Sequence, residues 1–197
     1  MKIILATHNQ HKREEIFSLA GNSFELDILP DDFSEIPETG TTLEENALIK
    51  ARFVFEKLKI PALADDTGLE VNALGGAPGV YTARYAGENA TYEDNCRKLL
   101  QDLAGHLDRS ARFVTIICYI DEKGGEHFYK GIVEGVITRS FRGTNGFGYD
   151  PVFEPLEGDK KTFAEMTLEE KNKISHRARA LRLFIEDQVR TGKNGTE

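Results

Sequence analysis

The chain has 197 residues, of which 40% are hydrophobic and 29% are charged, a balance typical of a folded globular protein and not of a disordered one. Its formal net charge of −8 argues against non-specific binding to nucleic acid, and no apolar run approaches the ~20 residues of a membrane-spanning helix. Cys96 and Cys118 lie far apart, as small core residues do in a reducing compartment. We therefore expect a cytoplasmic protein that binds neither nucleic acid nor membrane.

The first expected elements are a strand, a helix and a second strand. Residues 2–6 form a short apolar run typical of a buried strand. Apolar residues at helical spacing follow, and Gly21 can end that helix. Alternating apolar positions across 24–28 then predict another strand.

The next helix is marked by its capping residues. Thr42 and Glu45 have the spacing of a capping box, and Pro61 ends the helix that they begin. Residues 62–64 predict a short apolar strand, which we expect to end abruptly in the acidic segment 65–68.

The middle of the chain predicts a capped helix and an antiparallel hairpin. The glycine-rich residues 75–79 indicate a loop, and Thr91 with Asp94 forms another capping box. The β-type segments 111–121 and 126–137 are joined by a short glycine-containing turn, which is typical of a hairpin.

A second glycine-rich loop, residues 142–151, precedes two further helices. Thr167 with Glu170 predicts a short capped helix, and Ser175 can cap a last one. Residues 190–197 are polar and are expected to form a disordered tail. The expected core face of the last helix consists of Ala178, Leu181, Phe184, Ile185 and Val189.

This order of elements predicts an α/β fold. Helices alternate with strands and one strand pair is an antiparallel hairpin, so we expect a mixed sheet flanked by helices. No repeat, low-complexity segment or linker divides the sequence, and residues 1–189 are therefore expected to form a single domain.

Two basic segments lie where helices begin, the places where ligand sites of α/β sheets gather. Residues 7–12 offer a hydroxyl, an amide and an ammonium for a phosphate, although a capped turn with a solvated lysine is the more common explanation of such a segment taken alone. Lys171 and residues 175–177 gather cationic groups across a helix junction, where an ordinary charged surface is the alternative.

Two adjacent carboxylates, Asp65 and Asp66, follow the short apolar strand. On an extended chain they point to opposite sides, so only one is expected to face a ligand. Such a carboxylate can hold Mg²⁺ or accept a proton from water, and an Asx turn ended by glycine is the alternative. Glu38 is a further candidate, whereas Glu44 and Glu45 at a helix start are better explained by capping.

Residues 144–151 are suited to a flat ligand. Small residues let the backbone approach it, an aromatic ring can stack on it, and Asp150 can accept hydrogen bonds from ring N–H groups. A tight turn with packed aromatic side chains is the competing interpretation. Taken with the acidic and basic segments, the pattern is consistent with a metal–phosphate site.

In this order the segments resemble the inosine triphosphate and xanthosine triphosphate pyrophosphatases, also called Ham1-like proteins. The resemblance is collinear from Ile4 to about Ile185, and it departs from the family pattern at His8 and Asn145, where glycine is usual. The matching motifs lie at residues 6–12, 38–40, 45–47, 50–51, 64–69, 74–80, 83–85, 146–151, 170–171 and 175–177.

The resemblance implies hydrolysis of a nucleoside triphosphate between its α and β phosphates, which gives the monophosphate and pyrophosphate and requires Mg²⁺. The implied substrates are the non-canonical purine nucleotides ITP, dITP and XTP, which the enzyme removes from the nucleotide pool. It also implies an elongated mixed sheet, two α/β lobes with a central cleft, and a homodimer.

The resemblance also implies roles for individual residues. Glu38 and Asp66 hold the metal, and Asp66 serves as general base for the attacking water. The implied substrate-binding residues are Thr7, His8, Asn9, Gln10, His11 and Lys12 for the triphosphate, Thr67 as a further contact, and Phe147, Gly148, Tyr149, Asp150, Lys171, His176 and Arg177 for the nucleobase and phosphates.

Two other functions remain open. The opening Ala-Thr-x-Asn-x-x-Lys pattern is also similar to that of the Maf-type nucleotide pyrophosphatases, although residues 175–177 favour the first family. A nucleotide-sensing module that binds without turnover is the alternative outside the enzymes. Asp66 and Glu38 argue against it, because a pure binder needs no general base.

Overall fold

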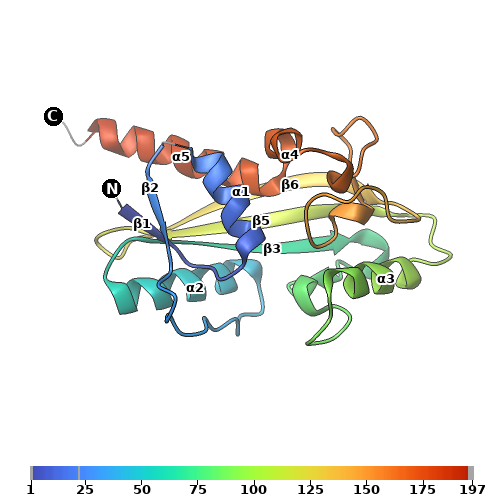
Figure 1. Ribbon diagram of the computed structural model, residues 1–197, viewed down its shortest axis with the longest axis horizontal. Helices are drawn as coiled ribbons and strands as arrows, with labels where there is room; N and C mark the ends of the chain where they lie inside the picture. The colour runs from blue at the N-terminus through green and yellow to red at the C-terminus, as the bar shows by residue number, and fades with distance from the viewer. Residues whose placement is uncertain (1, 22, 195–197) are drawn as a thin grey trace. The chain divides into compact units, whose positions relative to one another are not determined.

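The computed structural model describes residues 2–21 and 23–194. Over these residues, seven strands form one sheet in the order β2-β1-β3-β5-β6-β7, with β4 paired to β3 (Figure 1). Parallel pairing of β1 with β2 and antiparallel pairing of β6 with β7 make the sheet mixed. The predicted α/β fold with a mixed sheet is confirmed.

The chain divides into two compact units. The first contains the described residues of Met1–Asp66, Thr115–Gly131 and Arg177–Glu197. The second contains Thr67–Val114 and Ile132–His176. The unit boundaries cut strands β3, β5 and β6, so each of these strands contributes residues to both units.

The strands of the first unit begin at the N-terminus. β1 (Lys2–Leu5) pairs in parallel with β2 (Glu25–Ile28) and with the start of β3 (Ala62–Val71). β5 (Ser110–Ile120) and β6 (Glu126–Ile137) are neighbours in the sheet. The amide of Asp121 donates to the carbonyl of Gly125 at 3.0 Å and closes the turn between them, as the predicted hairpin requires.

Three helices cover the first unit. α1 (Gln10–Ala20) and α5 (His176–Asn194) pack against the same strands, while α2 (Leu43–Leu58) lies on the other side of those strands (Figure 1). No described helix is both long enough and apolar enough to cross a membrane. The core beneath α1 and α5 consists of Ile3, Leu5, Ile16, Leu63, Ile117, Tyr119, Tyr129, Ala180, Leu181 and Phe184.

The second unit has its own core. β4 (Pro78–Gly79) pairs with the end of β3, β7 (Phe153–Pro155) pairs with the end of β6, and helices α3 (Tyr92–Asp102) and α4 (Leu168–Ile174) complete it. Four 3-10 helices cover Asn72–Leu74, Thr82–Arg84, Asp150–Val152 and Phe163–Glu165. Its buried side chains include Leu69, Val71, Leu99, Leu103, Phe113, Val133, Ile137, Val152, Phe153 and Phe163.

Local sequence signals placed the helix starts correctly. Thr42, Thr91 and Thr167 each cap a helix, and in each case the acidic residue three positions later completes the capping box. Asn9 caps α1 in a simpler way, because its side chain accepts a hydrogen bond from the amide of Lys12.

The prediction that the strand ends before Asp65 is wrong, and so is the alternative of an Asx turn at residues 65–68, because β3 continues through them to Val71. Asp and Gly disfavour strands, but this preference is weak when tertiary contacts oppose it. Here both aspartates are buried and paired with cationic side chains from other elements, which holds the backbone extended.

The last helix also differs from expectation. α5 continues to Asn194, into the segment expected to be a disordered tail, and residues 195–197 lie outside the described part of the chain. Ala178, Leu181 and Phe184 are buried as predicted. Val189 was expected in the core but is 52% exposed. The apolar face of α5 therefore leaves the core before its apolar pattern ends.

Candidate active site

The loop between β1 and α1 is held by its own side chains. The hydroxyl of Thr7 accepts a hydrogen bond from the amide of Asn9 at 3.1 Å, and the Asn9 side chain accepts one from the amide of Lys12 at 3.1 Å. The ammonium of Lys12 lies 3.3 Å from a carboxylate oxygen of Asp65. The start of α1 therefore offers backbone N–H groups, the positive end of the helix dipole and one lysine, the features that bind phosphate.

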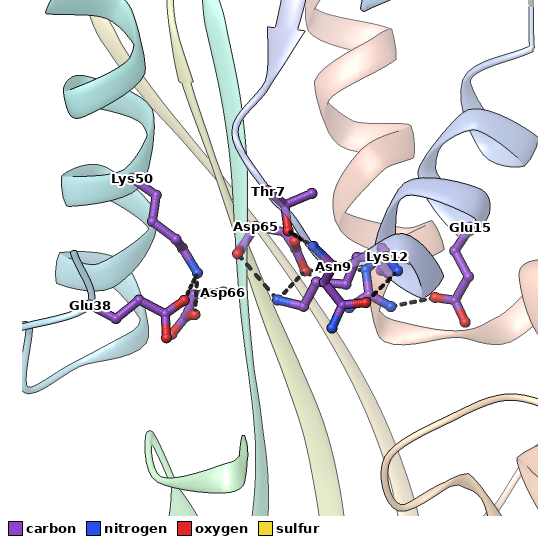
Figure 2. Close-up of polar contacts among 9 residues, drawn as sticks. Thr7, Asn9, Lys12, Glu15, Glu38, Lys50, Asp65 and Asp66 are labelled. Carbon is purple, nitrogen blue, oxygen red and sulfur yellow. Dashed lines mark hydrogen bonds and ion pairs between the residues drawn. The ribbon is translucent and has the colours of Figure 1, made fainter. Parts of the chain in front are cut away.

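Asp65 and Asp66 point to opposite sides of β3, as the alternation of a strand requires (Figure 2). Asp65 faces Lys12 of α1, whereas Asp66 faces Lys50 of α2 (Figure 2). The prediction that adjacent carboxylates separate is confirmed. Each carboxylate has a cationic partner of its own, so different charged groups surround Asp65 on one side of the strand and Asp66 on the other.

On the first side lies a buried ion cluster. Arg177, at the start of α5, donates through Nε and Nη2 to Asp65 at 3.2 and 3.0 Å, and through Nη1 to Glu15 of α1. The Arg177 side chain is only 1% exposed. Burial acts to raise the pKa of Asp65, but the charges of Lys12 and Arg177 outweigh it and lower that pKa.

Lys12 completes this cluster at its less buried end, with a side chain that is 16% exposed. Burial lowers the pKa of Lys12 although Asp65 acts to raise it. Any further negative charge that approaches this partly desolvated lysine would stabilise its charged form. An anionic group such as a phosphate would supply that charge.

On the second side, Lys50 joins two carboxylates. Its ammonium lies 2.6 Å from an oxygen of Asp66 and 3.0 Å from an oxygen of Glu38 (Figure 2). Burial raises the pKa of Asp66 more than Lys50 lowers it. Burial also acts to raise the pKa of Glu38, but there the attraction of Lys50 prevails and the pKa is lowered. Asp66 is thus the better proton acceptor near neutral pH, and Glu38 the more firmly ionised group.

The pair Glu38 and Asp66 suits a hard divalent cation. Both carboxylates contact the same ammonium, so their oxygens converge on one region that already attracts positive charge. In the described part of the chain, no group of three or more His, Cys, Asp or Glu side chains could hold a metal ion. Two carboxylates match Mg²⁺, which takes one or two of them and completes its shell with water and substrate phosphate.

The glycine-rich loop of the second unit is organised by Asp150. One oxygen of Asp150 accepts from the amide of Phe147 at 2.9 Å and from the ammonium of Lys171 at 2.6 Å. The same ammonium lies 5.0 Å from the centre of the Phe147 ring. Gly146 has a φ of +73°, and a Cβ there would lie 2.0 Å from Asp150, so only glycine fits. Phe147 is held in a half-buried position.

Other predicted contacts have structural roles in the second unit. The Tyr149 hydroxyl donates to the carbonyl of Thr82 at 2.9 Å, and the carbonyl of Gly148 accepts from Cys96 at 3.3 Å. The His176 ring is buried 4.6 Å from the ring of Phe113. These residues shape the loop and the core around it, and substrate contact by them stays a prediction.

The two departures from the family pattern lie on exposed loops. Asn145 donates from its side-chain amide to the carbonyl of Met166 at 2.9 Å, and so ties the glycine-rich loop to the segment before α4. His8 Nε2 lies 3.4 Å from the carbonyl of Ser34. Gln10 contacts Glu14 within α1. For His8, Gln10 and His11, substrate contact stays a prediction.

The structure therefore distributes the predicted site residues between the two units. The first contains Thr7–Lys12, Glu38, Asp66 and Arg177, and the second contains Thr67, Phe147–Asp150, Lys171 and His176. Sequence reasoning missed Glu15, which is buried against Arg177. One signal was present: Glu15 lies beside Ile16 on the apolar face of α1, where an acidic residue needs a cationic partner.

Replacing Asp65 with asparagine should change how stability depends on pH. The folded state lowers the pKa of Asp65 below its ordinary value of 3.8, so its contribution to stability is present above that pH and is lost as the pH falls below it. The stability difference between wild type and Asp65→Asn should therefore be large at neutral pH and shrink below the ordinary value. Urea unfolding across this range, without divalent cations, measures it.

Asp27→Asn is the matched control, because Asp27 pairs with Lys2 on the surface with both side chains 48% exposed. Its effect on the free energy of unfolding should be small, about 0–1 kcal/mol at any pH. A pH-independent difference for Asp65→Asn would contradict the assigned ion cluster.

Comparison with known proteins decides the family. Residues 3–187 match the model of the Ham1 family. The chain belongs to the Ham1 family. This chain is 54% identical over 186 residues to the dITP/XTP pyrophosphatase of Thermoanaerobacter pseudethanolicus, and the alignment covers 92% of this chain and 93% of the relative. It is 47% identical over 188 residues to the dITP/XTP pyrophosphatase of Flavobacterium johnsoniae, covering 94% and 97%.

Solved structures agree with this assignment. This chain resembles a HAM1 protein from Coxiella burnetii with a TM-score of 0.86 and 41% identity, and the alignment covers 96% of this chain and 99% of that one. It resembles the Staphylococcus aureus Ham1 protein with a TM-score of 0.85 and 39% identity, covering 95% and 98%. The family and the fold that the motif resemblance predicted are thus confirmed.

Proposed function

We propose that this Ham1 family chain is a dITP/XTP pyrophosphatase, which hydrolyses ITP, dITP and XTP to the monophosphate and pyrophosphate. Relatives of that name align with more than nine-tenths of its length. The observation that carries a hydrolytic role is the Asp66–Lys50–Glu38 arrangement, in which one of two neighbouring carboxylates has a raised pKa. A module that only binds nucleotides has no use for such a base.

Hydrolysis begins with a water molecule beside Asp66. Asp66 accepts a proton from this water as its oxygen attacks the α-phosphorus, and the bond from that phosphorus to the bridging oxygen breaks. Pyrophosphate leaves with the electron pair. Lys12 and the N-terminal N–H groups of α1 stabilise negative charge that grows on the departing phosphates.

Magnesium is the cofactor that we propose for this site. Glu38 and Asp66 would hold it, and when bound it would neutralise phosphate charge. Lys50 lies between the same carboxylates and keeps their charges balanced before the nucleotide arrives.

We assign nucleobase recognition to the loop of the second unit. The half-buried Phe147 ring offers a stacking surface beside the buried Lys171–Asp150 ion pair, and we assign the remaining donor and acceptor capacity of this pair to the base. Hypoxanthine and xanthine carry a 6-oxo group and an adjacent N–H. A 6-amino group would leave such partners unpaired, and sites built to hydrogen-bond can discriminate by roughly 10⁴-fold.

The first product tests this function. Purified enzyme is incubated with inosine, xanthosine, adenosine or guanosine triphosphate and Mg²⁺, and phosphorus NMR follows the products. Pyrophosphate and monophosphate should appear together, faster from the inosine and xanthosine nucleotides, and EDTA should stop the reaction. Orthophosphate as the first product, or no turnover, would overturn the proposal.

We also propose that the enzyme acts in the cytoplasm as a homodimer. Cys96 and Cys118 are both free and buried, in keeping with a reducing compartment. The homodimer proposal rests on the family resemblance. Light scattering on the purified chain, at micromolar concentration, should give twice the mass of one 22.1 kDa chain.

A further inference from the structure

The loop that carries Glu38 runs from β2 to α2 without helix or strand of its own. Its second half is tied to the start of α2. The amide of Gly40 donates to the side chain of Asn46 at 2.8 Å, and Lys50 binds Glu38. The Glu38 side chain is nevertheless 44% exposed, and a single ion pair with an exposed partner is weak. Apart from the 3.4 Å contact of His8 Nε2 with the carbonyl of Ser34, these contacts leave the first half of the loop unattached.

A second attachment lies further along α2, at Lys57. Its ammonium donates to the hydroxyl of Ser34 at 2.6 Å and lies 4.4 Å from the centre of the Phe53 ring and 5.4 Å from that of Phe33. The two rings meet edge to face, with centres 6.0 Å apart. Phe33 and Ser34 belong to the loop, whereas Phe53 and Lys57 belong to α2. We call these four residues the Lys57 clamp.

The two lysines of α2, Lys50 and Lys57, contact the loop from the same face of the helix. Lys50 and Lys57 are seven residues apart, about two helical turns, and so lie on the same face of the helix. Lys50 holds the loop at Glu38, and Lys57 holds it at residues 33–34. A loop fixed at two points along one helix face samples fewer conformations than a loop fixed at one. The clamp therefore restricts where Glu38 can lie.

We propose that Lys57 is a positioning residue for the metal site, which fixes the loop so that Glu38 stays beside Asp66. The proposal rests on the proposed function, because it concerns the same two carboxylates. Lys57 acts through the loop, and its contacts are with Ser34, Phe33 and Phe53. Its loss should weaken metal binding while leaving the chemical step intact once metal is saturating.

The test compares Lys57→Met with Lys57→Arg. Methionine keeps the length but removes the charge and the donor, whereas arginine keeps both and can still lie over the rings. The probe is Mn²⁺, whose binding without nucleotide is measured by electron paramagnetic resonance. Hydrogen exchange of residues 29–42 gives a second readout. Arg52→Met is the control, because it removes a cation of α2 that pairs instead with Glu126 of β6.

Lys57→Met should bind Mn²⁺ about three- to tenfold more weakly, because part of the stabilisation from an exposed cation–π contact and one hydrogen bond is transmitted through the loop to Glu38. Amide exchange in the loop should accelerate, kcat at saturating metal should stay unchanged, and Lys57→Arg should restore most of the affinity. Arg52→Met should match wild type.

Unchanged Mn²⁺ affinity and loop exchange in Lys57→Met would overturn the role of Lys57. A wild-type enzyme that binds no Mn²⁺ would overturn both the metal site and the positioning role. Normal Mn²⁺ binding without pyrophosphate release would contradict the proposed function, while the clamp would still be judged by the affinity of the Lys57 variants.

Discussion

Asp66→Asn should lose most of the turnover and still bind nucleotide. Asparagine has nearly the same shape as aspartate but cannot accept a proton from water, so the rate of hydrolysis should fall by about 10²- to 10⁴-fold. Lys12 and the start of α1 remain in place to hold phosphate. Pyrophosphate release measures the first effect, and calorimetry with an inosine nucleotide measures the second. Unchanged turnover would place the base elsewhere.

The free energy of unfolding should respond differently to substitution of Asp66 and of Asp65. Burial raises the pKa of Asp66 in the folded state, so its ionised form costs folding free energy at neutral pH. Asp66→Asn should therefore lose less stability than Asp65→Asn, because removing the buried charge of Asp66 offsets part of the loss of its ion pair with Lys50. For the same reason, the activity of the wild type should fall as the pH drops through the raised pKa of Asp66. An equal or larger loss of stability in Asp66→Asn than in Asp65→Asn would contradict this division.

Arg177→Ala should have the largest effect on stability. The buried guanidinium binds Asp65 and Glu15, and its removal takes a buried counter-charge from both carboxylates, although Lys12 remains beside Asp65. Breaking a buried ion pair from one side costs about 3–5 kcal/mol. Urea unfolding at pH 7 measures the free energy of unfolding. Arg97→Ala is the control, since Arg97 pairs with Glu93 within α3 at the surface and should cost under about 0.5 kcal/mol.

To test the sequence-based prediction that Arg177 contacts substrate, a variant that still folds is needed, because Arg177→Ala is expected to be strongly destabilised. Arg177→Lys keeps the charge but loses the planar fork that joins Asp65 to Glu15. We expect a higher KM for inosine triphosphate in this variant, because Asp65 also positions Lys12 beside the phosphate loop. An unaltered KM in a well-folded Arg177→Lys would contradict a role for Arg177 in substrate binding.

Local signals account for most of what could be predicted. Capping boxes depend on residues three positions apart, and the predicted boxes at Thr42, Thr91 and Thr167 are all present. Apolar periodicity placed β6 within its observed bounds. The chemistry of the site was also visible, because carboxylates, amides and lysines occur in short segments that match the motifs of one family.

What could not be predicted depends on contacts between distant segments. Arg177 meets Asp65 across 112 residues and Glu15 across 162, and no periodicity encodes such pairs. The same contacts keep β3 extended through a segment whose composition favours a turn. For the same reason, the sequence allowed Arg177 to be interpreted only as a cation of a charged surface or, from the family resemblance, as a substrate contact. Only packing decides whether a cation is buried.

The alternation of Asp65 and Asp66 also constrains how this protein can evolve. Deleting or inserting one residue between Pro61 and Asp65 would rotate every later side chain of β3 to the opposite face. The carboxylate that now faces Arg177 would then meet Lys50, and the one that now faces Lys50 would enter the ion cluster. Point substitutions can adjust either side separately, but the length of this short segment has to be inherited unchanged.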